Sequence, residues 1–194
     1  MFKTIKNIVR LVLKNFSLLL ILFVLFANNV LGAEDAEKKF IGFVDSLEGS
    51  VNKEDVDDLI KLHAFDLMFT HDKIKIGSNS SIIASFIDNS ILTLESDSEF
   101  LVEKFDKISE EPSFIITIIK GKFAFESGTI AKNDKGIMKI KLGEMEIDLK
   151  GTAITGSISD ADDEITIALV EDTMKNTGEI KVSTGDETIT ITEA

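Results

Sequence analysis

Strict alternation of apolar and polar residues is the feature that most limits what this chain can fold into, and it is clearest in residues 138–159. Apolar side chains occupy every second position of residues 138–142 and again of residues 145–149, with Gly143 between the two runs and Gly151 after the second. A period of two puts alternate side chains on opposite faces of a β-strand. The stretch therefore predicts two strands joined by a turn, each with one buried and one solvated face.

Shorter runs of the same kind continue from residue 40 onward, and glycine, serine, asparagine or aspartate separates them at intervals of roughly 8 to 12 residues. Residues 88–90 suit a tight turn between the runs 82–87 and 91–94. Residues 114–119 are nearly all apolar, which predicts a strand buried on both faces. About a dozen short strands with such turns predict an all-β domain, arranged as a sandwich, a barrel or a solenoid-like roll.

Residues 54–67 fit this pattern poorly and leave two interpretations open. Acidic residues at 54, 55, 57 and 58 suit the first turn of a helix, where the helix dipole favours negative charge. Four apolar residues follow helical spacing: Val56, Leu59, Ile60 and Leu62. We expect either a short helix or a connection between strands here.

The first 33 residues have the features of an export signal. Four basic residues (Lys3, Lys6, Arg10 and Lys14) precede an apolar run at residues 16–26, and no acidic residue occurs before Glu34. The run is about half of the ~20 residues that a membrane-spanning helix needs, which favours a cleaved signal over a permanent anchor. The chain contains no cysteine, which excludes lipoprotein processing and disulfide bonds.

We therefore divide the chain into a signal peptide at 1–33, a polar linker at 34–40 and an all-β domain at 41–194. Export predicts a bacterial periplasmic, secreted or cell-surface location, with no permanent membrane span after cleavage. Of the 21 lysines and arginines, four lie in the signal, so 17 remain against 34 acids, a net charge near −17. Such an acidic protein is not expected to bind nucleic acid, because phosphate contacts need an excess of basic residues.

Two groups of residues are candidate metal ligands, and for each the simpler interpretation is favoured. The only histidines are His63 and His71, near Asp66 and Asp72, but zinc needs three or four converging ligands and the spacing gives no shared strand face. Residues 160–164, which contain Asp160, Asp162, Asp163 and Glu164, could surround calcium but lack the glycine and the distant glutamate of an EF-hand loop. We expect structural or solvated histidines and a solvated acidic turn.

Enzymatic chemistry has little support in the sequence. There is no cysteine nucleophile and no G-x-S-x-G motif, and carboxylates are too numerous to single out a catalytic pair. Fourteen phenylalanines without tryptophan or tyrosine also weaken a carbohydrate-binding interpretation. We assign no catalytic, cofactor-binding or metal-binding residue and expect no cofactor.

Five motifs, in order, resemble those of the FecR-like domain family, the extracytoplasmic domain of iron-dicitrate sensor proteins. Residues 49–51 match its G-x-V strand, and residues 71–77 match its GD-x-I-x-T-G turn, with His71 at the first glycine. Residues 81–94 match S-x-A-x-L-x-F-x-D-G-S-x-L-x-L, with Asn89 at the glycine. The G-x-F-x-x-x-x-G and I-G-V-R-G-T motifs are matched by residues 121–128 and 149–152, so the resemblance covers about residues 41–192.

The resemblance implies an all-β fold outside the cytoplasm and no catalytic set. In the sensor members a cytoplasmic helical domain binds a sigma factor, but only 15 residues precede Phe16 here, so we do not expect that role. We expect a non-enzymatic protein-interaction, signalling or scaffolding module, which contacts an unknown protein partner by a sheet face or by an edge strand such as residues 189–192. The alternative is a calcium- or ligand-binding surface protein that uses its acidic loops.

Overall fold

The computed structural model describes residues 38–56, 58–159, 164–170 and 178–192, and within these ranges the chain forms 15 β-strands and no helix. The predicted all-β fold class is therefore confirmed for this part of the chain. No helix in these ranges is long and apolar enough to cross a membrane.

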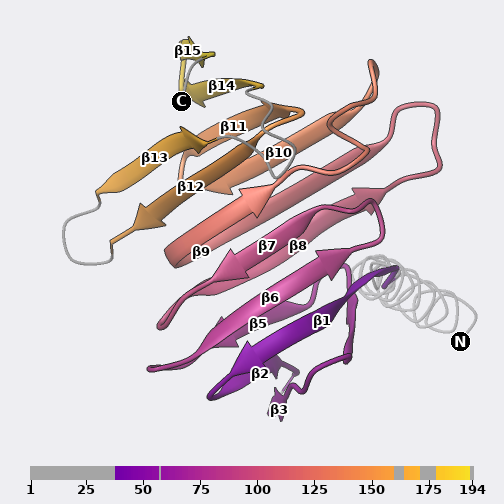
Figure 1. Ribbon diagram of the computed structural model, residues 1–194, viewed down its shortest axis with the longest axis vertical. Helices are drawn as coiled ribbons and strands as arrows, with labels where there is room; N and C mark the ends of the chain where they lie inside the picture. Colours follow the sequence, from indigo (N-terminus) through magenta and orange to yellow (C-terminus); the bar gives the residue numbers. More distant parts are fainter. Residues whose placement is uncertain (1–37, 57, 160–163, 171–177, 193–194) are drawn as a thin grey trace, which may run out of the picture. The chain divides into compact units, whose positions relative to one another are not determined.

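The strands pair into one continuous sheet that is folded over into two layers, with strands following one another nearly in chain order (Figure 1). The first layer contains β1 (Phe40–Glu48), β4 (Leu67–Phe69), β6 (Ser81–Phe86), β7 (Ile91–Leu94), β12 (Ala153–Ile158) and β13 (Ile165–Val170). The second layer contains β2 (Val51–Glu54), β3 (Leu59–Lys61), β5 (Lys73–Ile76), β8 (Glu99–Asp106), β10 (Ile137–Leu142), β11 (Met145–Lys150), β14 (Glu179–Thr184) and β15 (Glu187–Ile191).

The long strand β9 (Ser113–Glu126) joins the layers because it belongs to both. Its first half pairs with β8 and, in parallel, with β10, while its second half pairs with β7 and β12. The change of layer falls at Gly121, whose φ of +96° is open to glycine but strained for other residues. A side chain there would also overlap Ser98, so both backbone conformation and space require glycine.

A single hydrophobic core fills the space between the layers. Phe114, on the first half of β9, has its ring centroid 4.8 Å from that of Phe86 on β6 and 5.0 Å from that of Phe105 on β8. The contact with Phe86 crosses from one layer to the other, whereas Phe105 is paired with Phe114 on the neighbouring strand of the same layer. Such edge-to-face contacts are worth about 0.5–1.5 kcal/mol each beyond the area they bury. The alternating pattern in 138–149 is confirmed, since Ile140, Leu142 and Ile147 are buried on β10 and β11.

Three sequence-based expectations need correction. Among the described residues the sheet is open, because the first layer ends at β4 and β13 and the second at β3 and β15, so the barrel alternative is wrong. Of the two interpretations of residues 54–67, the helix is wrong where they are described and the connection between strands is confirmed; only Leu62 of the four helically spaced residues is buried. Residues 114–119 are not buried on both faces, because the outer face of the second layer leaves Ile119 partly exposed.

Candidate functional site

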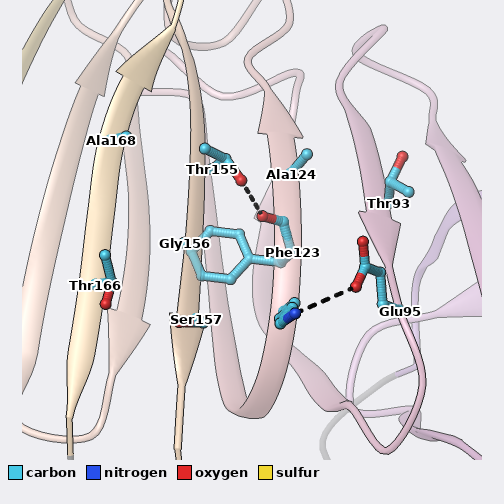
Figure 2. A pocket seen from close by; sticks show the side chains of 10 residues that line it. Thr93, Glu95, Phe123, Ala124, Thr155, Gly156, Ser157, Thr166 and Ala168 are labelled. Atoms are coloured by element: carbon cyan, nitrogen blue, oxygen red, sulfur yellow. Dashed lines mark hydrogen bonds and ion pairs between the residues drawn. The ribbon is translucent and has the colours of Figure 1, made fainter.

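A groove lies on the outer face of the first layer, in the described part of the chain (Figure 2). It has a volume of about 280 Å³ and lies over β7, β9, β12 and β13. Gly156 lines it where β12 pairs with β9, and a Cβ atom at Gly156 would lie 2.9 Å from the buried ring of Phe123. The Thr155 hydroxyl donates a 3.0 Å hydrogen bond to the Phe123 carbonyl, which holds β12 against β9.

Small, uncharged side chains cover this face. Thr93, Ala124, Thr155 and Ala168 form one row across the four strands, because each is paired in register with the next. Charge enters only at the rim, where Lys122 lies 4.0 Å from Glu95 and both side chains are exposed. The face is therefore suited to contact with another flat, uncharged surface.

The lining offers no catalytic arrangement. A hydroxyl nucleophile needs an adjacent base, and the hydroxyls of Ser157 and Thr166 have only Glu95 as an ionisable acid in the same lining. The ion pair that Glu95 makes is with Lys122. Neither histidine of the chain is among the lining residues.

The outer face of the second layer is different, because charged residues alternate in sign across its strands. Glu54 contacts Lys73 and Lys75, and Lys73 also contacts Glu99. Further along the layer, Lys141 lies 2.7 Å from Glu103, and Lys139 lies 2.7 Å from Glu146 and 3.6 Å from Asp148. These charged side chains of the second layer are paired with one another, so the uncharged outer face of the first layer is the better candidate for contact with a partner.

These pairs make stability depend on pH in acid. The hydrogen bond from Lys139 holds the pKa of Glu146 below its ordinary value of 4.5, and a hydrogen bond from Lys75 does the same for Glu54. A carboxylate with a lowered pKa stabilises the fold above its unfolded pKa, and this stabilisation is lost as pH falls through the folded pKa. We expect the melting temperature to fall as pH drops below about 4.5 and the fall to be shallower in Glu146→Gln. Glu110→Gln, on an exposed turn, is the control, and equal slopes for all three proteins would contradict the expectation.

The two histidines, Asp66 and Asp72 do not converge on one site in the structure. His63 is exposed, and its Nδ1 lies 3.6 Å from Asp66. Asp72 is buried, accepts a 2.9 Å hydrogen bond from the Phe69 N–H, and lies within ion-pair distance of Lys38 and Lys53. Among the described residues, no group of three or more histidine, aspartate or glutamate side chains could hold a metal.

The acidic turn at residues 160–164 lies almost wholly outside the described residues. Asp160, Asp162 and Asp163 are not described. Glu164 is described, and its carbonyl accepts a 3.1 Å hydrogen bond from the Ser159 N–H, which starts the pairing of β12 with β13. The calcium interpretation stays a prediction.

Polar residues of the sequence motifs form a buried hydrogen-bond network at the turns. The Asp88 carboxylate accepts hydrogen bonds from the Ser90 N–H at 3.1 Å and from the Ser90 hydroxyl at 2.9 Å. The Ser90 oxygen in turn accepts the Gly128 N–H at 2.9 Å, and the Asp88 carbonyl accepts the Thr129 N–H at 2.7 Å. Two successive turns of the chain are thereby joined.

A second set of hydroxyls acts in the same way. The Thr152 N–H donates to the Ser127 hydroxyl oxygen at 2.8 Å, and that hydroxyl donates to the Thr152 carbonyl at 2.7 Å. Elsewhere the Ser80 hydroxyl oxygen accepts the Ser50 N–H at 2.9 Å, and the Ser80 N–H donates to the Ser96 hydroxyl oxygen at 3.1 Å. These serines and threonines therefore connect turns of the chain through hydrogen bonds to the backbone and to one another.

A comparison with protein families fits this architecture. A family model described as "FecR protein" matches residues 72–175, more than half of the chain. The chain belongs to the FecR family. The predicted resemblance is thus confirmed, and the hydrogen-bond networks described above account for the polar residues of the motifs in this FecR-family chain. No curated protein sequence matches the chain.

Two crystal structures from Parabacteroides distasonis ATCC 8503, of a protein provisionally named an anti-sigma factor, have a similar fold. One superposes with a TM-score of 0.50 at 8% sequence identity, and the other with 0.48 at 10%. Each similarity covers 62% of this chain but only 50% of the solved chain. At this identity the comparison shows shared fold alone.

Sequence reasoning missed two surfaces. The groove was hidden because Thr166 and its neighbours have high β propensity and need no ligand to explain them. The exposure of the apolar residues between 56 and 67 was not predicted, because the helical spacing of Leu59 and Ile60 left a short helix and a strand connection equally open. The aspartates around those apolar residues gave no clear signal, because they suit the first turn of a helix as well as an exposed connection.

Proposed function

We propose that this FecR-family chain is an exported, non-enzymatic regulatory module that binds a protein partner outside the cytoplasmic membrane. The signal-like residues 1–33 and the family's extracytoplasmic domains support the location. The internal use of the motif hydroxyls and carboxylates supports a non-enzymatic role, because those side chains are held by one another. The provisional anti-sigma name of the solved relatives is consistent with signalling.

The observation that carries the proposal is the open end of the first layer at β13. Among the described residues β13 pairs only with β12, so its other edge is unpaired. Its six residues contain no charge, no proline and no glycine. Edge strands of soluble proteins usually carry lysine, proline or a bulge that discourages pairing, so an uncharged edge beside an uncharged face is suited to accept a partner strand.

The predicted edge at residues 189–192 corresponds to β15, which ends the second layer. Its residues include Glu187 at one end, and Ile189 is exposed. We favour β13 because it adjoins the groove of the first layer, whereas β15 continues the charged second layer.

A lysine at the β13 edge should weaken partner binding. Ala168→Lys places a charge on an exposed position of the edge strand, and we expect the yield of a crosslinked complex on the exported protein to fall about tenfold, equivalent to ~1.4 kcal/mol of binding free energy. Chemical crosslinking of the tagged protein in the cell envelope, followed by quantitative mass spectrometry, measures this. The matched control is Ala124→Lys, exposed on the same face but on the central strand β9.

The two variants separate the contact modes. Loss in Ala168→Lys alone supports strand addition at β13, and equal loss in both supports the sheet face as the contact. If neither variant changes the yield, the proposed contact on this side of the molecule is wrong. The calcium-binding alternative is a separate proposal, which calorimetric titration of the protein with calcium tests.

A further inference from the structure

Exposed apolar side chains concentrate at the opposite end of the sheet from β13. We define the β3–β4 corner by five of them, all between the end of β2 and the start of β4: Val56, Leu59, Ile60, Phe65 and Leu67. Scattered exposed apolar residues need no explanation, but a concentration over so short a stretch of an otherwise acidic chain does. Such concentrations mark interaction sites in soluble proteins.

Phe65 is the most unusual residue of the corner. Its side chain is 74% exposed, and its backbone has a φ of +72°, in the left-handed region that a bulky side chain rarely adopts. The conformation is fixed locally, because the Phe65 N–H donates a 2.7 Å hydrogen bond to the Val44 carbonyl and the Val44 N–H donates to the Asp66 carbonyl at 2.9 Å. The turn therefore holds an aromatic ring out toward solvent at the expense of backbone strain, with no burial of the ring in return.

Strain of this kind persists where function requires it. Phe65 makes none of the aromatic contacts found among the described residues, whereas Phe40, nearby on β1, packs against Phe69 with ring centroids 6.1 Å apart. A large aromatic side chain that a fixed backbone holds in solvent has the properties of a binding anchor, since much apolar surface is buried when it enters a pocket.

Negative charge exceeds positive charge around the corner, where Lys61 on β3 is the one lysine or arginine between Val56 and Leu67. Asp45 follows Val44, Asp55 precedes Val56, Asp58 precedes Leu59, and Asp66 follows Phe65. Among the described residues none of these four carboxylates forms an ion pair with lysine or arginine, and Asp66 has only the neighbouring His63. By contrast, the carboxylates of the second layer are paired with lysines.

This charge selects among possible occupants. A second copy of the chain would bring the same four aspartates against each other, and like charges in an interface oppose association. A bacterial membrane surface is anionic and would repel the corner. A protein segment that combines apolar side chains with lysine or arginine complements both the apolar residues and their acidic surroundings.

The corner also lies outside residues 72–175, the part that matches the family model. The match to the family model therefore gives no information about the corner. This position suits a surface that determines which partner the chain binds.

We propose that the β3–β4 corner is the docking site for a basic, apolar segment of a partner protein, with Phe65 as its anchor. The proposal rests on the proposed function as a protein-binding module, and it names the chemistry of the partner. Phe65 enters an apolar pocket of that segment, and lysines or arginines of the partner face the aspartates.

Two synthetic peptides with the same alternating apolar residues, one with lysine and the other with glutamate between them, test this by fluorescence anisotropy with the full exported chain. We expect the lysine peptide to bind, the glutamate peptide not to bind, and the binding to weaken as salt is raised. Phe65→Gly should weaken binding at least about tenfold, as for an interface anchor. The control is Ile108→Gly, which removes an apolar side chain that is 94% exposed on a distant turn.

Phe65→Gly also separates lost binding from lost folding. Glycine adopts a φ of +72° without strain, so the melting temperature of this variant should not fall. Equal binding by wild type and Phe65→Gly, equal loss in Ile108→Gly, or failure of the lysine peptide to bind would overturn the proposal. So would Phe65-dependent binding to phosphatidylglycerol vesicles or Phe65-dependent dimers in sedimentation.

These results are independent of those for β13. If the corner proposal fails while Ala168→Lys still lowers the yield of the crosslinked complex, the chain is a protein-binding module that uses another surface. If no crosslinked complex forms with wild type, the proposed function itself fails.

Discussion

Replacing Asp72 with asparagine should lower the free energy of unfolding by about 2–3 kcal/mol and the melting temperature by roughly 5–10 °C. The Asp72 side chain is 2% exposed, and it is the point where three parts of the chain meet. Oδ2 accepts the Phe69 N–H at 2.9 Å and lies 3.6 Å from Lys53, while Oδ1 lies 3.1 Å from Lys38. Asparagine keeps the shape but removes the charge that both ammonium groups face.

The magnitude follows from burial. Removing one partner of a buried ion pair costs about 3–5 kcal/mol, because the remaining charge is left without compensation. Here Lys38 is more than half exposed and water can solvate it, so the expected loss is smaller. Thermal and urea unfolding of the two proteins measure the difference.

Asp66→Asn is a matched control. Asp66 accepts the His63 N–H at 2.8 Å across the same three-residue spacing that joins Asp72 to Phe69, but its side chain is 43% exposed and no lysine pairs with it among the described residues. Its loss should cost less than about 0.5 kcal/mol. Asparagine can still accept the turn hydrogen bond in both proteins, so equal destabilisation by the two substitutions would mean that burial of the Asp72 charge adds nothing to stability.

Two positions at which this chain departs from the family motifs show how much local structure can be predicted from the sequence. His71 and Asn89 occupy positions where the family pattern has glycine, and both have positive φ, of 66° and 67°. Gly151, the glycine in the motif at residues 149–152, has a φ of 67°. The motif glycines therefore mark backbone conformation, which is a local property, and a pattern of local properties is readable without the structure.

The arrangement of the strands in two layers could not be predicted from the sequence, because it depends on contacts between residues far apart in the chain. Nothing in the composition of residues 113–126 shows that the first half of β9 pairs with β8 and β10 and the second half with β7 and β12. The parallel pairing of β9 with β10 likewise depends on where the chain returns after residue 126. Periodicity predicts which face of a strand is buried, but not which strand lies beside it.

The exposed surfaces could not be predicted from the sequence for a related reason. Exposure of Leu59 and Phe65 is a property of the edge position of β3 and of the turn before β4. The same residues on a central strand would be core. A sequence pattern gives the apolar residues, and only the strand order shows which of them are left without neighbours.

Gly128→Ala should destabilise the fold by about 3 kcal/mol, lowering the melting temperature by roughly 6–12 °C. A Cβ atom at this position would overlap the Asp88 carbonyl oxygen and lie 2.6 Å from the Ser90 nitrogen and 2.8 Å from the Asp88 carboxylate. All three atoms belong to the buried network that joins the two turns, and two of them are backbone, so none can move aside cheaply. Thermal unfolding measures the loss.

Two further variants separate the causes of that loss. Gly143→Ala tests backbone strain alone, because Gly143 has a φ of +60° but no atom within 4 Å of a Cβ, and it should cost about 1 kcal/mol. Ser90→Ala removes the hydroxyl that bonds Gly128 and Asp88 without adding an atom, and it should cost about 1–3 kcal/mol. If Gly128→Ala yields no folded protein, Ser90→Ala still reports on the network. A loss in Gly128→Ala no greater than in Gly143→Ala would mean that the turns separate easily, and the motif residues would then need an explanation other than joining them.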